Sequence, residues 1–288
     1  DGIGVVELLD DYVDLWDLIV GTWKDDSLTS RFSSEANHEE YIKQFRAVTN
    51  KPIVGVGRFT SPDTMVSQIK RGVLDMIGAT RPSIADPFIP NKIDEGRTED
   101  IRECIGCNIC VSTHKTMAPI RCTQNPTMGE EWRKGWHPEQ MPSKGSDDNV
   151  LVVGAGPAGL ECARALGARG YPVTLAEATR NLGGRVHHEA RLPGLAEWGR
   201  VRDWRVTQLD KLSNVEVYRE SLLNAEQVLE FGFAHVAIAT GARWRKDGYG
   251  RMNNDPIAGS TDATNVYSPD DLMAGATPPG PVVVFDDD

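Results

Sequence analysis

The chain has 288 residues, of which 40% are hydrophobic and 25% charged, a composition typical of globular domains. Its net charge of -11 and lack of a basic block exclude a polyanionic partner such as nucleic acid. No apolar run approaches the ~20 residues of a membrane span, so we expect no membrane association. The first residue is not Met, and strand-like segments lie near both ends, so we expect an internal fragment of a longer protein.

Residues 1–95 alternate between strand and helix patterns. The predicted elements are a buried strand over Val13–Val20, an amphipathic helix over Glu39–Val48, a strand over Lys51–Arg58, a helix from Ser61 to Arg71 and a strand over Leu74–Ala79. The second helix begins with a capping hydroxyl, a proline at its first position and an acid near the positive end of its dipole. This alternation predicts a parallel sheet with right-handed crossovers.

Residues 96–145 have little periodicity and are rich in Cys, Pro, Trp and charge, so something other than a hydrophobic core must order them. A metal cluster would serve, and Pro138–Asp148 resembles a linker. A second α/β pattern begins at Asn149. Its predicted elements are a strand over Val150–Val153, a helix over Ala158–Arg169, a strand over Val173–Glu177, a strand over Val236–Ala239 and a terminal strand over Val282–Phe285.

Four of the five cysteines lie within nineteen positions, as Cys104, Cys107, Cys110 and Cys122 in the pattern C-x2-C-x2-C-x11-C. Three cysteines at this spacing plus a distant fourth are typical of the ligands of a 4Fe-4S cluster. A structural zinc and free core thiols are the alternatives. The spacing favours a reducing compartment over a disulfide scaffold, and we expect a cytoplasmic protein. Cys162 stands alone and is expected to pack in a helix.

A glycine fingerprint, G-x-G-x-x-G, lies between a predicted strand and a predicted helix. Gly154 permits the tight turn, Gly156 lets the backbone approach a pyrophosphate, and Gly159 lets the helix pack on the strand. Glu177 ends the next strand, where an acid would bind ribose hydroxyls. Further nucleotide-contacting turns of flavin disulfide-reductase-like domains correspond to Gly183-Gly184-Arg185 and Ala239-Thr240-Gly241. We expect an adenine nucleotide here, and a nucleotide-free relic of the fold is the alternative.

Two predicted strands of residues 1–95 are followed by an arginine, in Gly57-Arg58 and Thr80-Arg81. The loops after the last two strands of a parallel barrel often build a phosphate site. Backbone amides and two guanidinium groups suit the phosphate of a flavin. A surface ion pair is the alternative for each arginine taken alone.

Several longer segments resemble the trimethylamine, dimethylamine and histamine dehydrogenase family, and the match runs nearly end to end. They are Val54-Gly-Val-Gly-Arg58, Ala79-Thr-Arg-Pro-Ser-Ile-Ala-Asp86, Cys104-Ile-Gly-Cys-Asn-Ile-Cys110, Cys122-Thr-Gln-Asn125, Gly135-Trp-His-Pro138 and Ala239-Thr-Gly-Ala-Arg-Trp244. The resemblance implies an α/β protein with FMN, a 4Fe-4S cluster and ADP, with FAD as the alternative to ADP. Its expected parts are the C-terminal part of a TIM barrel (1–95), an iron-sulfur segment and linker (96–145), a Rossmann-like nucleotide-binding domain (146–280) and the start of a second one (281–288).

The same resemblance implies that a small amine reduces FMN and that electrons leave one at a time through the cluster to an electron-transferring flavoprotein. A homodimer is expected for the full-length protein. Trp23 corresponds to an aromatic residue of the substrate bowl, and Asp26 to the acid of a Tyr-His-Asp set near the flavin. His114 stands where a second bowl aromatic is expected, which favours an amine other than trimethylamine. Without the resemblance, simple packing of Trp23 and a loop cap by Asp26 would be preferred.

An NAD(P)H-dependent enoate or 2,4-dienoyl-CoA reductase is the alternative with the same architecture. As the resemblance implies, such reductases usually have three residues between the second and third cluster cysteines, and here there are two. They also need a second glycine fingerprint, but Val282–Phe285 is followed by three aspartates, which cannot form the glycine turn and would repel a pyrophosphate. Both features favour the dehydrogenase. A non-enzymatic electron-transfer subunit is a third possibility, which the strand-end arginines disfavour.

Overall fold

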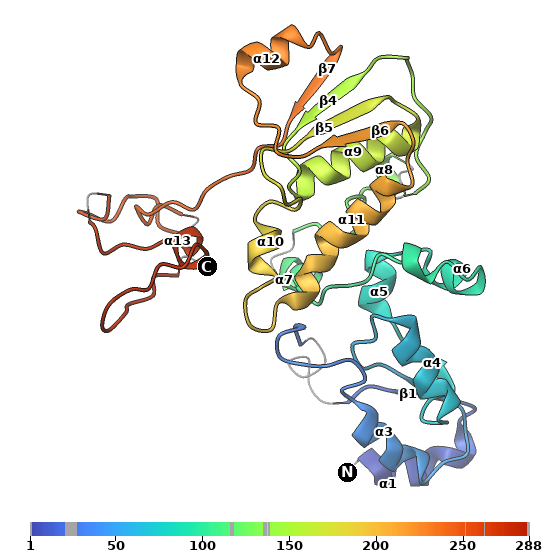
Figure 1. Ribbon diagram of the computed structural model, residues 1–288. Coiled ribbons are helices and arrows are strands. Elements are labelled where there is room, and N and C mark those ends of the chain that lie inside the picture. The colour runs from blue at the N-terminus through green and yellow to red at the C-terminus, as the bar shows by residue number, and fades with distance from the viewer. Residues whose placement is uncertain are drawn as a thin grey trace.

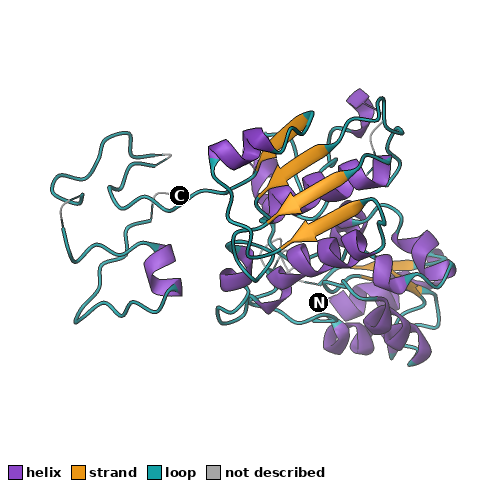
Figure 2. Ribbon diagram, turned by 45° about the horizontal axis from the view of Figure 1, so that its top comes forward, coloured by secondary structure: helices purple, strands orange, loops and turns teal. Residues whose placement is uncertain are grey.

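The computed structural model describes residues 2–20, 28–115, 118–134, 137, 139–250, 252–261 and 263–286. Its described parts form two α/β units, drawn in blue to cyan and in green to orange in Figure 1, with the cysteine segment between them. The last residues form an arm that extends away from the second unit (Figures 1 and 2). In the described part of the chain, no helix is long and apolar enough to cross a bilayer.

The first unit contains a parallel three-stranded sheet in the order β1-β2-β3. Its strands are β1 (Trp16–Leu18), β2 (Ile53–Gly55) and β3 (Met76–Ile77). Its helices are α1 (Gly2–Leu9), α3 (Glu39–Arg46), α4 (Pro62–Lys70), α5 (Thr80–Ala85) and α6 (Ile89–Asp94), with short 3-10 turns η1 (Asp10–Tyr12) and η2 (Thr98–Asp100). The core between sheet and helices includes Ile42, Ile53 and Leu74. The predicted parallel strand–helix alternation is confirmed.

The start of α4 follows its sequence signal. The Ser61 hydroxyl accepts a hydrogen bond from the Thr64 N–H at 3.4 Å, and Pro62 occupies the first helical position. Because the first N–H groups of a helix have no partner within the helix, this cap stabilises the predicted start.

The strands of the first unit are shorter than predicted. β1 covers three residues of Val13–Val20, and β3 covers two residues of Leu74–Ala79. Each pairs only with β2 among the described strands, so each ends where its single ladder ends. The sequence predicts a loop at Thr80 and Arg81 after this strand. In the structure both residues instead lie in the first turn of helix α5.

The second unit is a parallel four-stranded sheet in the order β6-β5-β4-β7, which Figure 2 shows as four aligned arrows. Its strands are β4 (Val150–Val153), β5 (Val173–Ala176), β6 (Val215–Tyr218) and β7 (His235–Ile238). This is the strand order of a Rossmann-type nucleotide-binding half. The remaining helices of the described residues are α7 (Ile109–Lys115), α8 (Glu131–Lys134), α9 (Pro157–Arg169), α10 (Val186–Glu189), η3 (Ala196–Gly199), α11 (Arg200–Asp210), α12 (Ala225–Glu230) and α13 (Pro269–Met273).

The core of the second unit lies under α9 and α11. Leu160 and Ala163 of α9 pack on Val152 and Leu175 of the sheet, with Leu209 of α11 beside them. These five side chains are almost completely buried, which anchors the start of α9 above the carboxyl end of β4.

The terminal strand predicted over Val282–Phe285 is wrong, because these residues form no strand. All four side chains are exposed, Val283 to 94%. Their β-branched and aromatic composition favours a strand, but no described strand lies alongside to supply ladder hydrogen bonds.

Candidate functional site

The glycine fingerprint has the geometry of a phosphate-binding loop. Gly154 has a positive φ of 99°, and a side chain there would place Cβ 2.5 Å from the Ala239 carbonyl oxygen. A Cβ at Gly159 would lie 1.8 Å from the Gly154 oxygen, so only glycine lets α9 pack on this turn. Gly156 caps α9, and a Cβ there would meet nothing within 4 Å. The loop therefore leaves open space at the helix N-terminus, where an anion is stabilised.

Glu177 lies just after β5 and is only 8% exposed. One carboxylate oxygen accepts the Ala155 N–H at 2.8 Å, and the other accepts the N–H and hydroxyl of Thr179, both at 2.9 Å. Glu177 thus ties the glycine loop to the end of β5. Each carboxylate oxygen has further acceptor capacity, and the predicted contact of Glu177 with a ribose stays a prediction.

The two further turns lie beside the same loop. The Gly183 N–H donates to the Ala155 oxygen at 2.8 Å, and a Cβ at Gly184 would lie 3.2 Å from Gly156 Cα. Arg185 donates to the Ala242 oxygen at 2.5 Å, which links this turn to the segment that follows Thr240 and Gly241. The predicted nucleotide residues are therefore brought together at the carboxyl edge of the sheet.

Arg58 follows β2 with a positive φ of 55° and is buried. Its Nη1 donates to the Ser33 oxygen at 2.8 Å, and its Nη2 pairs with the carboxylate of Glu197 on the second unit. A Cβ at Gly106 would come within 3.1 Å of the Arg58 guanidinium, so Arg58 packs on the cysteine segment. The ion pair forms here, while the phosphate contact stays a prediction. Sequence reasoning missed Glu197, which lies 139 residues away and carries no motif.

Arg81 also reaches the cysteine segment. Its Nη1 donates to the Asn108 side-chain oxygen at 2.6 Å and to the Leu28 oxygen at 3.0 Å. Gly57 is buried and Thr80 is exposed, and both follow adjacent parallel strands. The carboxyl ends of such strands meet at one edge of a sheet, so the two arginine segments are brought together as predicted.

The four cysteines are half-buried free thiols. Burial raises the pKa of the Cys104, Cys110 and Cys122 thiols, and the charges of neighbouring thiols raise it further. Cys104 is influenced by Cys107 and Cys122, and Cys110 by Cys104 and Cys107, so all four lie within electrostatic range of one another. Because a metal binds thiolates, a cation placed among these thiols would have to displace their protons, and its positive charge would stabilise the thiolate forms.

The donor set of four cysteine thiols suits either a 4Fe-4S cluster or a zinc ion. Backbone N–H groups face the sulfur atoms: Gly106 donates to Cys104 Sγ at 3.4 Å, and Gln124 and Asn125 donate to Cys122. Four thiolates around one zinc would lie about 4 Å apart, given a Zn–S distance of ~2.3 Å. In the described part of the chain, no three Cys, His, Asp or Glu side chains are gathered to hold one metal ion. A 4Fe-4S cluster takes one thiolate per iron, and its assignment to these cysteines stays a prediction from their spacing in the sequence.

The roles predicted for the substrate residues stay predictions. Trp23 and Asp26 lie outside the described residues. His114 lies on α7, but the description does not extend to its side chain.

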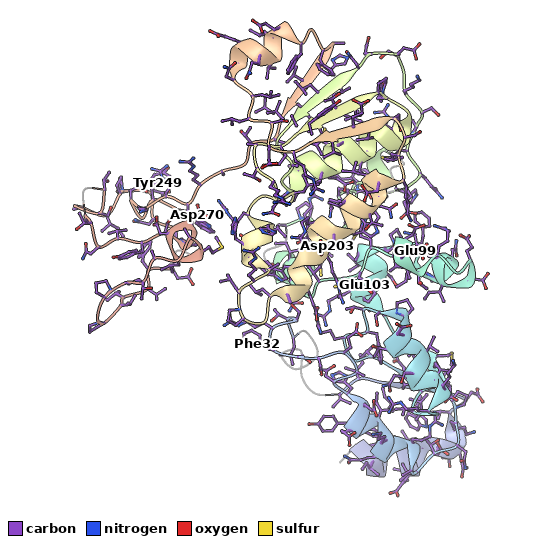
Figure 3. All side chains as sticks on the ribbon, viewed as in Figure 1. Phe32, Glu99, Glu103, Asp203, Tyr249 and Asp270 are labelled. Carbon is purple, nitrogen blue, oxygen red and sulfur yellow. The ribbon has the colours of Figure 1, made fainter. Side chains whose placement is uncertain are left out.

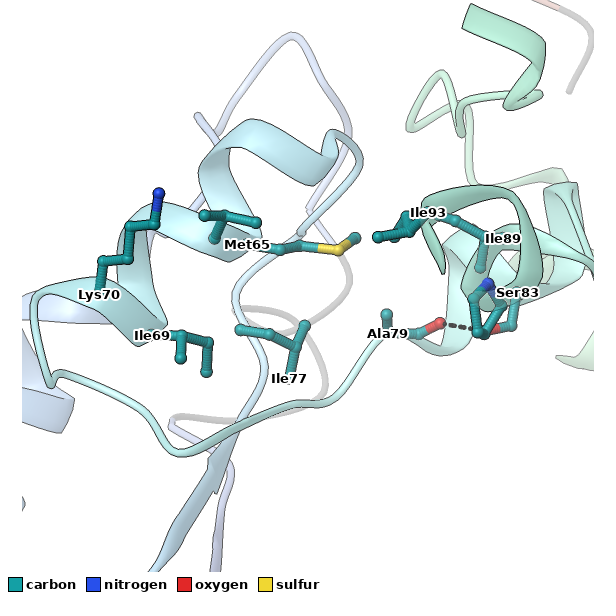
Figure 4. A pocket seen from close by; sticks show the side chains of 10 residues that line it. Met65, Ile69, Lys70, Ile77, Ala79, Ser83, Ile89 and Ile93 are labelled. Carbon is teal, nitrogen blue, oxygen red and sulfur yellow. Dashed lines mark hydrogen bonds between the residues drawn. The ribbon is translucent and has the colours of Figure 1, made fainter. Parts of the chain in front are cut away.

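A groove of about 490 Å³ lies on the first unit, between α4, β3 and α6. Figure 4 shows its walls, which include Met65, Ile69, Ile77 and Ile93. No predicted site residue lines it, and Lys70 is its one charged member. An apolar wall without convergent polar groups cannot orient a reacting molecule, so the groove is not a candidate active site.

Comparison with known proteins supports both units. Residues 4–100 match the NADH:flavin oxidoreductase / NADH oxidase family, and residues 152–215 match the NAD(P)-binding Rossmann-like domain. Dimethylamine dehydrogenase from Hyphomicrobium sp. (strain x) is 47% identical over an alignment of 286 positions that covers 96% of this chain and 39% of that protein. These matches confirm the flavin-oxidoreductase and Rossmann-like assignments.

Two solved structures are also similar over nearly the whole chain. Histamine dehydrogenase from Rhizobium sp. 4-9 has a TM-score of 0.90 and 59% identity, over 95% of this chain and 40% of that one. The 6-hydroxypseudooxynicotine amine oxidase from Pseudomonas geniculata N1 has a TM-score of 0.90 and 55% identity, over 96% and 41%. The chain therefore spans about two fifths of the length of these relatives.

Proposed function

Because the chain belongs to the family of the dimethylamine and histamine dehydrogenases, we propose that the full-length protein oxidises the C–N bond of a small amine with FMN and exports the electrons through a 4Fe-4S cluster. One observation carries this proposal. Arg58 and Arg81, which follow adjacent strands of the flavin-oxidoreductase unit, both contact the cysteine segment. A flavin held by its phosphate at these arginines would lie beside the cysteine quartet.

The cysteine quartet would hold the cluster, with one thiolate from each of Cys104, Cys107, Cys110 and Cys122. The inward-facing N–H groups and the half-buried thiols support this assignment. When bound, FMN supplies a two-electron acceptor and the cluster a one-electron carrier. The chain's own contribution is to hold the two close together and to exclude water from the thiols.

The phosphate of FMN would be bound by the backbone at Gly57 and Thr80 and by Arg58 and Arg81. Arg58 supports this, because its Nε is buried without a partner in the described part of the chain. An orphaned guanidinium N–H favours an anionic acceptor. With the phosphate bound, Arg58 would contact both the phosphate and the Glu197 carboxylate, or Glu197 would instead pair with Arg200, whose Nη1 lies 3.7 Å away.

The second unit would hold ADP, with FAD as the alternative, at Gly154, Gly156, Gly159, Glu177, Gly184, Arg185, Thr240 and Gly241. The open space at Gly156 supports a pyrophosphate there. We assign residues 1–95 to a TIM barrel, 96–145 to the cluster segment and linker, 146–280 to the nucleotide domain and 281–288 to the start of a second such domain.

An electron-transferring flavoprotein is the proposed acceptor, and the proposed enzyme is a cytoplasmic homodimer. The cysteine ligands support a cytoplasmic location, because they must stay reduced to bind the cluster and the cytoplasm is a reducing compartment. Trp23, Asp26 and His114 would line the amine site. A histidine in place of a second aromatic ring would suit an amine that accepts or donates a hydrogen bond.

The direction of electron flow separates the proposal from its reductase alternative. The full-length protein is mixed anaerobically with dimethylamine, with histamine or with NADH while the flavin absorbance is followed. We expect an amine to bleach the flavin and NADH to leave it oxidised. Rapid bleaching by NADH, with no response to either amine, would contradict the proposal and favour an enoate reductase.

A further inference from the structure

Arg205 of α11 lies beside the cysteine quartet but belongs to the nucleotide-binding unit. Its side chain is buried, with the residue only 3% exposed. Nη1 donates to the Gln124 side-chain oxygen at 3.0 Å and to the Val201 oxygen at 2.8 Å, and Nη2 donates to the Gln124 backbone oxygen at 3.1 Å. Its Nε lies 2.8 Å from a Glu161 carboxylate oxygen. The guanidinium therefore donates hydrogen bonds to both the side-chain and the backbone oxygen of Gln124.

Gln124 connects the Arg205 guanidinium to the first and the last cysteine of the quartet. Its backbone N–H faces the Cys122 sulfur. Its side-chain amide donates to the Glu103 oxygen at 3.0 Å, one residue before Cys104. Glu103 itself lies between the two units, where Arg200 of α11 pairs with it at 2.8 Å (Figure 3). Displacement of Gln124 would therefore move the first and last cysteine together.

Positive charge accumulates on this side of the quartet. The guanidinium groups of Arg102, Arg164 and Arg205 surround the Trp204 ring, with Arg102 at 4.1 Å from its centre. Glu161 pairs with Arg164 and Arg205, and Asp86 acts electrostatically on Arg102, so these three guanidinium groups are set against two carboxylates. The three guanidinium nitrogens of Arg102 have no hydrogen-bond partner among the described residues, and the group stacks on Trp204 instead. Burial lowers its pKa to about 10, which still leaves it charged at pH 7.

We propose, on the basis of the proposed function, that Arg205 is a positioning residue for the iron–sulfur cluster. By its hydrogen bonds to Gln124, Arg205 fixes the Gln124 N–H that faces Cys122. By its positive charge, Arg205 makes the cluster easier to reduce. A cluster gains one negative charge with each electron it accepts. A nearby fixed cation stabilises that reduced form, and N–H groups directed at sulfur act in the same sense. Burial lowers the pKa of Arg205, whereas the charges of Glu161 and Cys122 oppose that lowering, as expected for a guanidinium close to both.

The test is the reduction potential of the cluster in the full-length protein, followed by EPR during a redox titration. Arg205→Met should make cluster reduction at least tenfold less favourable, a fall of about 59 mV for one electron. Arg205→Lys keeps the charge but loses the paired hydrogen bonds to Gln124, so we expect a smaller fall in the reduction potential. Glu161→Gln removes the opposing carboxylate and should raise the potential. Arg169→Met is the matched control, since it removes the same charge where Arg169 contacts the Pro142 carbonyl, and should leave the potential unchanged.

Opposite shifts in Arg205→Met and Glu161→Gln would support the proposal, because loss of packing alone would not reverse sign. Wild-type potentials in Arg205→Met and Glu161→Gln would overturn it. If Arg205→Met fails to fold, Arg205→Lys and Glu161→Gln decide the outcome in the same way. A wild-type protein without iron would instead contradict the proposed function, which keeps the two failures distinct.

Discussion

Alanine at Gly159 should destabilise the fold, whereas alanine at Gly156 should weaken nucleotide binding and leave the fold intact. At Gly159 the new Cβ would lie 1.8 Å from the Gly154 oxygen, a backbone atom that cannot rotate away. Overpacking a core costs typically ~1–3 kcal/mol, and with a rigid obstacle we expect Gly159→Ala to lie at the upper end or beyond. The α9 helix must shift from the glycine turn, so the free energy of unfolding should fall.

Gly156→Ala should leave stability nearly unchanged, because its Cβ meets nothing within 4 Å and its φ of -69° suits alanine. Loss of a glycine cap costs up to ~1 kcal/mol, while the stiffer unfolded chain returns ~0.4–1 kcal/mol. The methyl group would, however, occupy the space proposed for the pyrophosphate. Loss of one hydrogen bond to a charged group, ~1.5–3 kcal/mol, would raise the Kd for ADP roughly tenfold to a hundredfold.

Urea denaturation and calorimetric titration with ADP, on full-length protein freed of nucleotide, measure both effects. The reasoning predicts a stable Gly156→Ala with weak ADP binding and an unstable Gly159→Ala. Wild-type ADP affinity in Gly156→Ala would refute the placement of the pyrophosphate at this loop. Wild-type stability in Gly159→Ala would refute the close packing of α9 on the turn.

Three further outcomes are expected. Lys92 is fully buried and pairs with Asp86 at 2.6 Å. Lys92→Met should lower the free energy of unfolding by ~3–5 kcal/mol, because Asp86 stays buried without this ion pair, and urea unfolding measures the loss. Hydrogen bonds from Arg71, Lys43 and Gln68 hold the pKa of Glu39 well below its usual 4.5, so its stabilisation is present above that pH and is lost as pH falls below it. Glu39→Gln should thus cost about 1 kcal/mol at pH 7 and little in strong acid, measured by urea unfolding at both. His114→Trp should shift the preference among methylated amines in steady-state assays, and an unchanged profile would remove His114 from the site.

Local sequence signals predicted much of the fold. Val150–Val153 forms the predicted strand to the residue, and Ser61 caps α4 as expected, because both depend on neighbours a few positions away. The glycine fingerprint likewise contains its own geometry. Val282–Phe285 shows the limit of such signals, since strand propensity has no effect without a partner to pair with.

Contacts between distant segments could not be predicted. Arg205 and Gln124 are 81 residues apart and belong to no shared motif. The same holds for Arg58 and Glu197, where a predicted anion-binding arginine meets a carboxylate of the other unit. Such pairs are decided by how the two units pack, which a one-dimensional pattern does not encode.

The central claim is that a cluster at the cysteine quartet receives electrons from an amine-reduced flavin. The most direct measurement is the EPR spectrum of the anaerobic full-length protein after addition of dimethylamine or histamine, together with its iron content. The account predicts about four irons per chain and a reduced-cluster signal that appears with amine and is absent in Cys110→Ala. Zinc without iron, or a cluster that stays silent while the flavin is bleached, would contradict it.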